Sequence, residues 1–424
     1  MTENKKITRR AFLKVSALAA VGLPALKSMA NIDPVSRLKT TATAGDHPPD
    51  AAGSSAERIS GLISADPVPA ALAAVDRNAP EQSRITAVQD AAQTATDFNW
   101  LSRGDAVLIK VALNSGNPFP ATTSPLSIQA MVELLLQKGA GRVIVSDMSG
   151  IEHVKLTPEG VQGSSRELMH ASGIAQAALT AGADLHFPEE AGWDAFFEDH
   201  PADTTYWNKG IMMPNIIRDV DHIVLMPRCS RHVLLGSSLG LKCAVGYWRT
   251  DSRLDYHKHA ATIQEKTADA NTVTCLRDKQ RLVITDATKI LTTLGPDDGF
   301  VAQPDPGLVI ASESVVVHDM LALAWLLQNR SAMDDEQVAR SRDPYQRQFI
   351  VSNLNRFVVL RLGDLSEAFQ AERLTRNDIL SIWDDRVLNR AYQVFGGIPE
   401  IRIINVNNTA PQGMLDSLSA MVSR

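Results

Sequence analysis

Short apolar runs alternate with helix-like segments from residue 105 onward, and this alternation limits the possible folds more than any other feature. Each run is nearly continuous, which is typical of strands buried on both faces of a parallel sheet. The predicted strands cover residues 105–113, 142–147, 183–187, 221–226, 281–286 and 307–312. Helical spacing predicts helices over residues 124–138, 165–181 and 315–328. The pattern predicts an α/β fold, a mostly parallel sheet with helices on both faces, plus a largely helical C-terminal region.

Composition divides the chain into four predicted segments. Residues 1–30 resemble an export signal. Residues 31–82 are predicted to form a flexible arm, because their first part is made of Thr, Ala, Gly, Ser and Pro with little apolar content. Residues 83–330 form the predicted α/β core, which begins with a helix over 84–98 capped by Ser83. Residues 331–424 form a helical extension that ends with a strand over 400–406, which could join the sheet edge.

The first thirty residues have the pattern of a twin-arginine signal peptide. Arg9-Arg10 and Phe12-Leu13-Lys14 precede a short, mildly apolar run over 15–24. Ser28-Met29-Ala30 offers a small-x-small cleavage site. The pattern predicts export by the Tat translocase, cleavage near Ala30 and a soluble periplasmic product. A chance basic pair before an ordinary secretion signal, and an uncleaved leader acting as an anchor, are the alternatives. The run is too short and too rich in Ala and Gly for a stable membrane span.

Charge and cysteine content exclude several classes of partner and site. The whole chain carries −6 and residues 1–30 hold six Lys/Arg and one acid, so residues 31–424 carry −11. Such an acidic protein is poorly suited to nucleic acid or to an anionic membrane surface. The three cysteines match no ferredoxin or zinc-ribbon spacing, so no iron–sulfur cluster is expected.

Polar side chains follow most of the predicted strands. In an open α/β sheet, ligands bind beyond the carboxyl ends of the strands, so these residues are expected to face one edge. The residues of this set that carry our site hypotheses are Lys110, Asn114, Asp147, Arg228, Arg231, His232, Asp286 and Asp319.

The segment 228–259 is unusually rich in charged side chains and histidine. Four of the ten histidines lie between residues 222 and 259. A cationic cluster in an acidic protein predicts an anion site, because arginine can hold a carboxylate or phosphate with two hydrogen bonds. The alternative is a solvated loop whose arginines pair with its own aspartates. His257 and His259 also have the spacing of metal ligands in an extended segment, and Asp147, Asp286 or Asp319 could complete such a site.

Common nucleotide-binding motifs are absent. No Gly-x-Gly-x-x-Gly follows the first strand, and the turn 295–299 lacks the Gly-Lys-Ser/Thr of a P-loop.

The order of these segments resembles the family catalogued as domain of unknown function 362, over residues 105–325. Three strands carry most of the resemblance: the strand with Lys110 followed by Asn114, the Arg-Val-Ile-Val-Ser-Asp strand followed by Ser149-Gly150, and the Asp221–Pro227 strand followed by His232. The later matching positions are Gly240-Leu-Lys242, Gly246, Asp286, Gly295-Pro296 and Asp319. The chain departs from the family pattern at Arg228–Arg231, where lysines are usual, and at Cys243, where an asparagine is usual. Because the family has no agreed reaction, the resemblance implies site positions and no mechanism. Some members carry four-cysteine ferredoxin segments, which this chain lacks.

Three functional hypotheses follow. In the first, an exported enzyme acts on a small anionic substrate held by Lys110, Asn114, Arg228, Arg231 and Lys242, with His232, His257 and Asp286 in acid–base roles. A divalent metal on Asp147, His257 and Asp319 is a further option in this hypothesis, and no other cofactor is indicated. In the second, the protein is a non-catalytic periplasmic factor that binds a cofactor or assists maturation. In the third, it is a folded passenger without cofactor.

Overall fold

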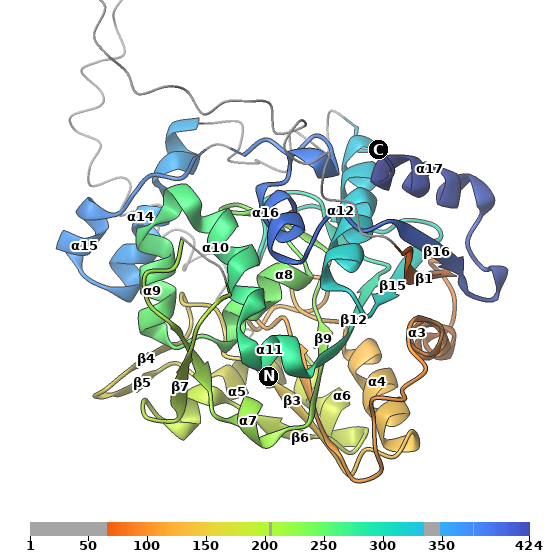
Figure 1. Cartoon of the computed structure of the whole chain (residues 1–424), viewed down its shortest axis with the longest axis horizontal. Coiled ribbons are helices and arrows are strands. Elements are labelled where there is room, and N and C mark those ends of the chain that lie inside the picture. Colours follow the sequence, from red (N-terminus) through yellow and green to blue (C-terminus); the bar gives the residue numbers. More distant parts are fainter. Residues whose placement is uncertain (1–65, 203–205, 335–347, 376) are drawn as a thin grey trace, which may run out of the picture. The chain divides into compact units, whose positions relative to one another are not determined.

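An eight-stranded sheet runs through the computed structural model, which describes residues 66–202, 206–334, 348–375 and 377–424 (Figure 1). The predicted signal peptide, and the predicted arm up to residue 65, lie outside the described residues. In spatial order the strands are β16 (Ile401–Asn405), β1 (Val68–Val75), β15 (Gly307–Ser312), β12 (Gln280–Ala287), β9 (His222–Met226), β2 (Ala106–Val111), β3 (Arg142–Ser146) and β6 (Asp184–His186). Neighbours are parallel except at β15, which is antiparallel to β1 and β12. The predicted α/β fold with a mostly parallel sheet is confirmed.

Helices connect and cover the strands. They are α3 (Glu81–Ala95), α4 (Pro125–Gln137), α5 (Ser165–Ala171), α6 (Ile174–Thr180), α7 (Ile216–Asp219), α8 (Gly240–Cys243), α9 (Thr250–Lys258), α10 (Ile263–Asp269), α11 (Thr274–Lys279), α12 (Val315–Ser331), α14 (Gln348–Leu362), α15 (Leu365–Gln370), α16 (Arg386–Val394) and α17 (Gln412–Val422). Minor strands are β4 (Lys155–Thr157), β5 (Gly160–Gln162), β7 (Phe196–Asp199), β8 (Ile211–Pro214), β10 (Ser230–His232), β11 (Gly236–Ser238), β13 (Ile290–Leu291) and β14 (Val301–Ala302).

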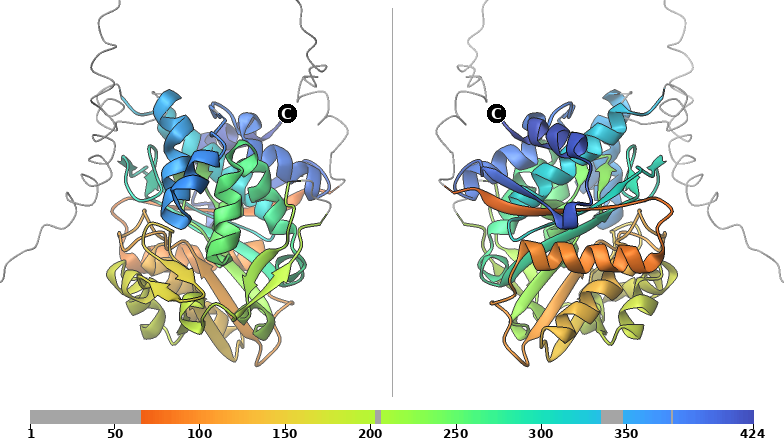
Figure 2. Two further views of the ribbon diagram at one scale, coloured as in Figure 1. Left: turned by 90° about the vertical axis from the view of Figure 1, so that its left-hand side faces the viewer. Right: turned by 90° about the vertical axis from the view of Figure 1, so that its right-hand side faces the viewer.

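The two faces of the sheet are buried by different helices. Side chains alternate along each strand, so Val107, Ile109 and Val111 pack with α3, α4 and α6 on one face. Leu108 packs on the opposite face, in the cluster that includes residues of α9 and α10. Figure 2 shows α3 and α17 on opposite sides of the β1 edge. A continuous apolar strand sequence therefore marks burial on both faces, as the sequence predicted.

The predicted flexible arm is wrong for residues 68–82. Strand β1 lies inside the sheet, between β15 and β16, and its Leu72 is fully buried. The sequence of β1 is mostly alanine with Pro69 near its start, so it lacks the branched bulk by which buried strands are usually recognised. Helix α3 begins at Glu81 behind Pro80, so the predicted N-cap Ser83 lies within the helix.

Residues after 330 contribute to the main core. Leu388 and Tyr392 of α16 and Leu418 of α17 belong to the same apolar cluster as Leu326 of α12. The predicted last strand is β16, which pairs in parallel with β1 at the sheet edge. The predicted helix over 165–181 is interrupted at Gly173, whose φ of 86° ends the regular helix between α5 and α6. No helix in the described part of the chain is long and apolar enough to cross a membrane.

The place of β1 in the core gives a stability prediction. Leu72→Ala is expected to lower the free energy of unfolding by about 2–5 kcal/mol, because it removes a fully buried side chain and leaves a cavity. The matched control is Leu380→Ala, at a leucine that is 85% exposed, where the change should stay within about 0.5 kcal/mol. Urea unfolding followed by circular dichroism measures both. Equal effects would contradict the burial of β1.

Candidate functional site

The strand order changes direction between β2 and β9. The chain runs from β2 through β3 to β6 toward one edge of the sheet, and from β9 to β12 toward the other. In open α/β sheets, the crevice beyond the carboxyl ends of the strands at such a point is where ligands bind. The segments after β2, β3 and β9 meet α8, α9 and the loop 292–300 there.

A buried ion pair between Lys110 of β2 and Asp147, which follows β3, lies at the carboxyl ends of these two strands. Lys110 Nζ lies 2.9 Å from Asp147 Oδ1, and both side chains are buried. Lys110 Nζ also donates to Cys243 O at 3.0 Å, and Asp147 Oδ2 accepts from Leu113 N at 2.7 Å. A Cβ on Gly246 would lie 2.0 Å from Asp147 Oδ1, so only glycine allows α8 and its extension to approach the pair this closely. Lys110 and Asp147 therefore pair with each other in this structure, and their predicted ligand roles stay predictions.

Asp319 caps a short helix. Its carboxylate accepts from the backbone N–H groups of Gly240 and Leu241, each at 2.8 Å, at the start of α8. His318 Nδ1 lies 2.7 Å from Asp319 Oδ1, and His318 Nε2 lies 2.8 Å from Thr285 Oγ1. The carboxylate therefore joins α12, α8 and β12, and its lone pairs are used within the protein.

The predicted metal and catalytic roles of Asp286, Asp147, His257 and Asp319 stay predictions, and the structure shows the local contacts of these side chains. Asp286 Oδ1 accepts from the backbone N–H and the hydroxyl of Thr288, at 3.1 and 2.6 Å, and so holds the turn after β12. In the described ranges, Asp147, His257 and Asp319 do not form a group whose ligand atoms lie together. The carboxyl ends of the strands lie at the same edge of the sheet, but these side chains form hydrogen bonds with nearby groups of the protein instead of converging on one point.

Four residues form what we call the basic cluster: Arg228, His232, Lys242 and His257. Their proximity is seen in their mutual electrostatic effects: Lys242 and Arg228 lower the pKa of His232, and Lys242 lowers that of His257. Burial contributes most to both shifts. The pKa of His257 falls to about 3 and that of His232 falls well below its usual range, so both rings are neutral at neutral pH.

Arg228 and Lys242 carry the charge of the basic cluster. Arg228 is buried and donates to the carbonyl of Ala121 and, at 3.3 Å, to the hydroxyl of Ser238. Burial, followed by repulsion from Arg228, lowers the pKa of Lys242 to about 7. Across the residues that the structure describes, neither side chain forms an ion pair with a carboxylate.

The histidines present complementary ring nitrogens. His232 Nδ1 accepts from Leu234 N at 3.1 Å, which places the proton of the neutral ring on Nε2. His257 Nδ1 faces Asn355 Oδ1 at 3.1 Å, which places its proton on Nδ1 and leaves Nε2 as an acceptor.

Arg231 lies near acidic groups, apart from its predicted role with Arg228. Burial, helped by the nearby Asp319, raises the pKa of Asp385 to about 7, although the backbone N–H of Leu388 and the charge of Arg231 lower it in part. Asp385 Oδ1 accepts from Leu388 N at 2.9 Å and caps α16. Asp385 and Asp319 line a small cavity of about 10 Å³ that Lys242 also lines. Arg231 therefore partly offsets buried carboxylates beside the basic cluster.

The rest of the 228–259 segment is largely structural. Arg249 forms an ion pair with Asp251 at 2.9 Å, as the solvated-loop alternative predicted, and its guanidinium lies 3.9 Å from the ring centre of Trp193. Arg253 donates to the carbonyls of Ser149 and Met148 at 2.6 and 2.7 Å, which fastens α9 to the segment after β3.

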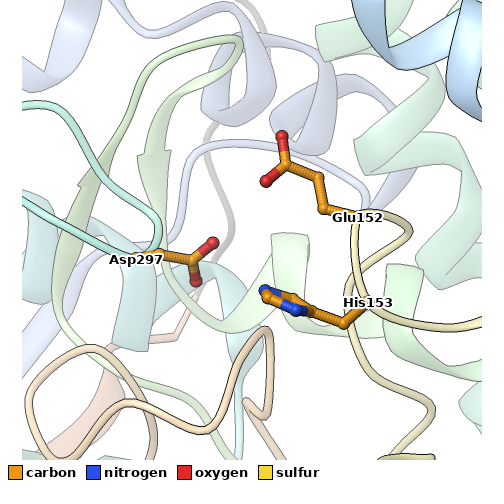
Figure 3. Close-up of side chains that lie close together, drawn as sticks. All are labelled: Glu152, His153 and Asp297. Carbon is orange, nitrogen blue, oxygen red and sulfur yellow. The ribbon is translucent and has the colours of Figure 1, made fainter. Parts of the chain in front are cut away.

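Glu152, His153 and Asp297 form a second group, which we call the rim triad (Figure 3). Their ligand atoms all lie within 4.8 Å of one another. Figure 3 shows Asp297 opposite Glu152 and His153, with the three side chains pointing toward a common space. Burial, and then the charge of Asp297, raise the pKa of Glu152.

In the sequence, Glu152 and His153 follow the predicted strand over 142–147 and Asp297 lies in the turn 295–299, but none of the site hypotheses combined them. Asn114, a predicted ligand-binding residue, explains the arrangement: its Nδ2 donates to both oxygens of Asp297, at 2.8 and 3.0 Å. Asn117 donates to the Asp297 carbonyl at 2.8 Å. These contacts join residues that lie 180 or more positions apart, and the sequence of the turn at 295–299 does not indicate its partner.

Comparison with known proteins gives one family match. The model described as "Domain of unknown function (DUF362)" matches residues 107–324, which is more than half of the chain. A comparison with curated proteins found no match. Two solved structures share part of the fold at low identity: a Thermotoga maritima protein (14% identity, TM-score 0.32, 51% of this chain and 52% of that chain) and the lactate racemase apoprotein from Thermoanaerobacterium thermosaccharolyticum (11% identity, TM-score 0.35, 52% of this chain and 50% of that chain). The chain thus spans about half the length of each.

The raised pKa of Asp385 predicts a pH-dependent effect of Asp385→Asn. Between about pH 4 and 7 the native state keeps a proton that the unfolded chain has released, so the free energy of unfolding falls by about 1.4 kcal/mol per pH unit as pH rises. Asparagine caps a helix about as well and does not titrate. The stability of Asp385→Asn relative to the parent should therefore rise from pH 4 to pH 7 and then level off.

Asp364→Asn is the matched control for this prediction. Asp364 caps α15, and hydrogen bonding to the backbone N–H of Glu367 lowers its pKa. Its relative stability should therefore change only below its ordinary pKa of 3.8, where it falls as pH rises, and should stay level between pH 4 and 8. Urea unfolding at pH 4–8 measures both, and parallel pH profiles would contradict the assignment for Asp385.

Proposed function

We propose that this chain, which belongs to the DUF362 family, binds a small anionic ligand at the basic cluster beyond β2 and β9. The observation that carries the proposal is that the buried Arg228 and Lys242 repel each other, while neither forms an ion pair within 4.0 Å with a carboxylate of the described residues. A buried cation without a partner is costly, and a bound anion would offset that cost.

The geometry favours a carboxylate or phosphate group as the ligand. Arg228 offers the planar donor set that matches such groups, and Lys242 adds a compact ammonium charge. The neutral rings of His232 and His257 add hydrogen-bonding capacity without more charge. The site also lies at the point of the sheet where α/β proteins commonly bind ligands.

Lys242 is the residue that we propose for proton transfer. Its pKa of about 7 allows it to take up or release a proton at neutral pH, as an acid–base group requires. His257, with a pKa near 3, is less suited to that task and fits better as a neutral hydrogen-bonding partner. The titration of Lys242 near neutral pH therefore favours an enzyme that acts on a small anion. Tight binding of an anion without turnover would instead favour a non-catalytic carrier.

The anion-binding proposal predicts stabilisation by inorganic phosphate or succinate. Either probe should raise the Tm of the parent protein in a saturable way, through preferential binding to the native state. Lys242→Gln should weaken binding by about 10- to 100-fold, which corresponds to the loss of a charged hydrogen bond of about 1.5–3 kcal/mol. Binding should also weaken as pH rises above about 7, because Lys242 loses its proton.

Arg249→Gln is the matched control, because Arg249 already pairs with Asp251. Arg228→Gln should weaken binding as Lys242→Gln does, although Arg228 also holds Ala121 and Ser238 in place. If both probes stabilise Lys242→Gln and the parent equally, or if Arg249→Gln loses binding as well, the basic cluster is not the site.

We also propose that the protein is exported by the Tat pathway, on the basis of residues 1–30. Arg9→Lys with Arg10→Lys should retain the precursor in the cytoplasm, since it preserves charge but removes the arginine pair. Lys5→Arg with Lys6→Arg is the charge-matched control and should leave export unchanged. Cell fractionation with mass spectrometry of the N-terminus measures both, and a parent protein found only in the cytoplasm, uncut near Ala30, would contradict export.

A further inference from the structure

We propose that the rim triad, Glu152, His153 and Asp297, binds one divalent transition-metal ion. The three side chains come from two separate loops, the one after β3 and the one between β13 and β14, and converge on a common space (Figure 3). Their ligand atoms lie within 4.8 Å of one another, close enough for each to reach one ion after small side-chain rotations.

The electrostatics of the triad favour a cation. Glu152 and Asp297 bring two negative charges together, and neither forms an ion pair with a basic side chain within 4.0 Å in the part of the chain that the structure describes. Arg228 attracts Asp297 at longer range while it is held by Ala121 and Ser238, and Arg361 attracts Glu152 in the same way. A divalent ion would offset the repulsion that remains between the two carboxylates.

The triad is also held in position by other residues. Asn114 Nδ2 donates to both Asp297 oxygens, which fixes the plane of the carboxylate, and each oxygen keeps lone pairs for a metal. His153 N donates to Gly150 O at 2.9 Å and Gly150 N donates to Asn114 O at 3.0 Å. The same asparagine thus orders both loops that supply the ligands, which is how metal sites orient their ligating side chains.

The donor set indicates the class of metal. One imidazole nitrogen and two carboxylates suit Zn²⁺, Mn²⁺ or Fe²⁺ better than Mg²⁺ or Ca²⁺, which prefer oxygen ligands alone. Three protein ligands leave at least one coordination position for water or a ligand, as in catalytic rather than structural sites. The triad and the basic cluster share no residue, but Asp297 and Arg228 interact electrostatically, so the metal and anion proposals are tested separately.

The test is metal binding by untagged, chelator-treated protein. Zn²⁺ or Mn²⁺ should bind the parent at one ion per chain in isothermal titration calorimetry. Glu152→Gln, Asp297→Asn and His153→Ala should each lower the affinity at least tenfold, and Asn114→Ala should lower it about 10- to 100-fold by releasing Asp297. Co²⁺ offers a second readout, because its visible spectrum should change in His153→Ala.

The control is the double variant Glu198→Gln with His200→Ala. These residues form another exposed carboxylate–histidine pair, with His200 Nε2 3.9 Å from Glu198 Oε1, and no third ligand joins them among the residues that the structure describes. The control should bind metal as the parent does. The proposal is overturned if the parent binds no more metal than the Glu152→Gln, His153→Ala, Asp297→Asn triple variant, or if the control loses the ion as well. Loss of metal binding with retained phosphate binding would leave the anion proposal standing, and the reverse result would remove only the anion proposal.

Discussion

The buried ion pair between Lys110 and Asp147 is the interaction on which the rest of this region depends. It joins β2 to the segment after β3, and through Cys243 O it reaches the end of α8. Removing one member of such a pair would leave an isolated charge in the interior, which typically costs more than the intact pair contributes. The pair therefore sets where the loops beyond β2 and β3 begin, and so where both the basic cluster and the rim triad can form.

The chain uses its acidic side chains in two different ways. Asp319 and Asp286 accept hydrogen bonds from backbone N–H groups, which stabilises the start of α8 and the turn after β12. Asp297 and Glu152 form no ion pair within 4.0 Å among the described residues, and neither do Arg228 and Lys242, although Arg228 and Asp297 attract each other at longer range. Such a gathering of weakly paired charges of both signs is more typical of a functional site than of a structural framework.

The sequence predicted the strands that are buried on both faces, and it failed where burial depends on small residues. The runs at β2, β9 and β12 contain valine, isoleucine and leucine in continuous order, which distinguishes them from loops. Strand β1 is mostly alanine, so its place in the sheet comes from partners more than 200 residues away. The site residues show the same limit: their position after strands was predictable, but the partner of each side chain was not. The sequence does not indicate that Lys110 and Asp147 form an ion pair with each other. The hydrogen bond between Asn114 and Asp297 likewise follows only from the fold.

The position of β1 has a consequence for how the chain folds as it is synthesised. Its neighbours in the sheet are β15, at residues 307–312, and β16, at residues 401–405, so one of the first ordered strands waits for one of the last. Pairings between distant segments form slowly because a long loop must close before any contact is gained. The β2–β3 and α4 region can assemble from local contacts early, whereas the β1 edge stays open until about residue 405 has left the ribosome. During that interval the alanine-rich segment of β1 exposes only a modest apolar surface. The unpaired segment is therefore less prone to aggregation than a strand of valine and isoleucine would be.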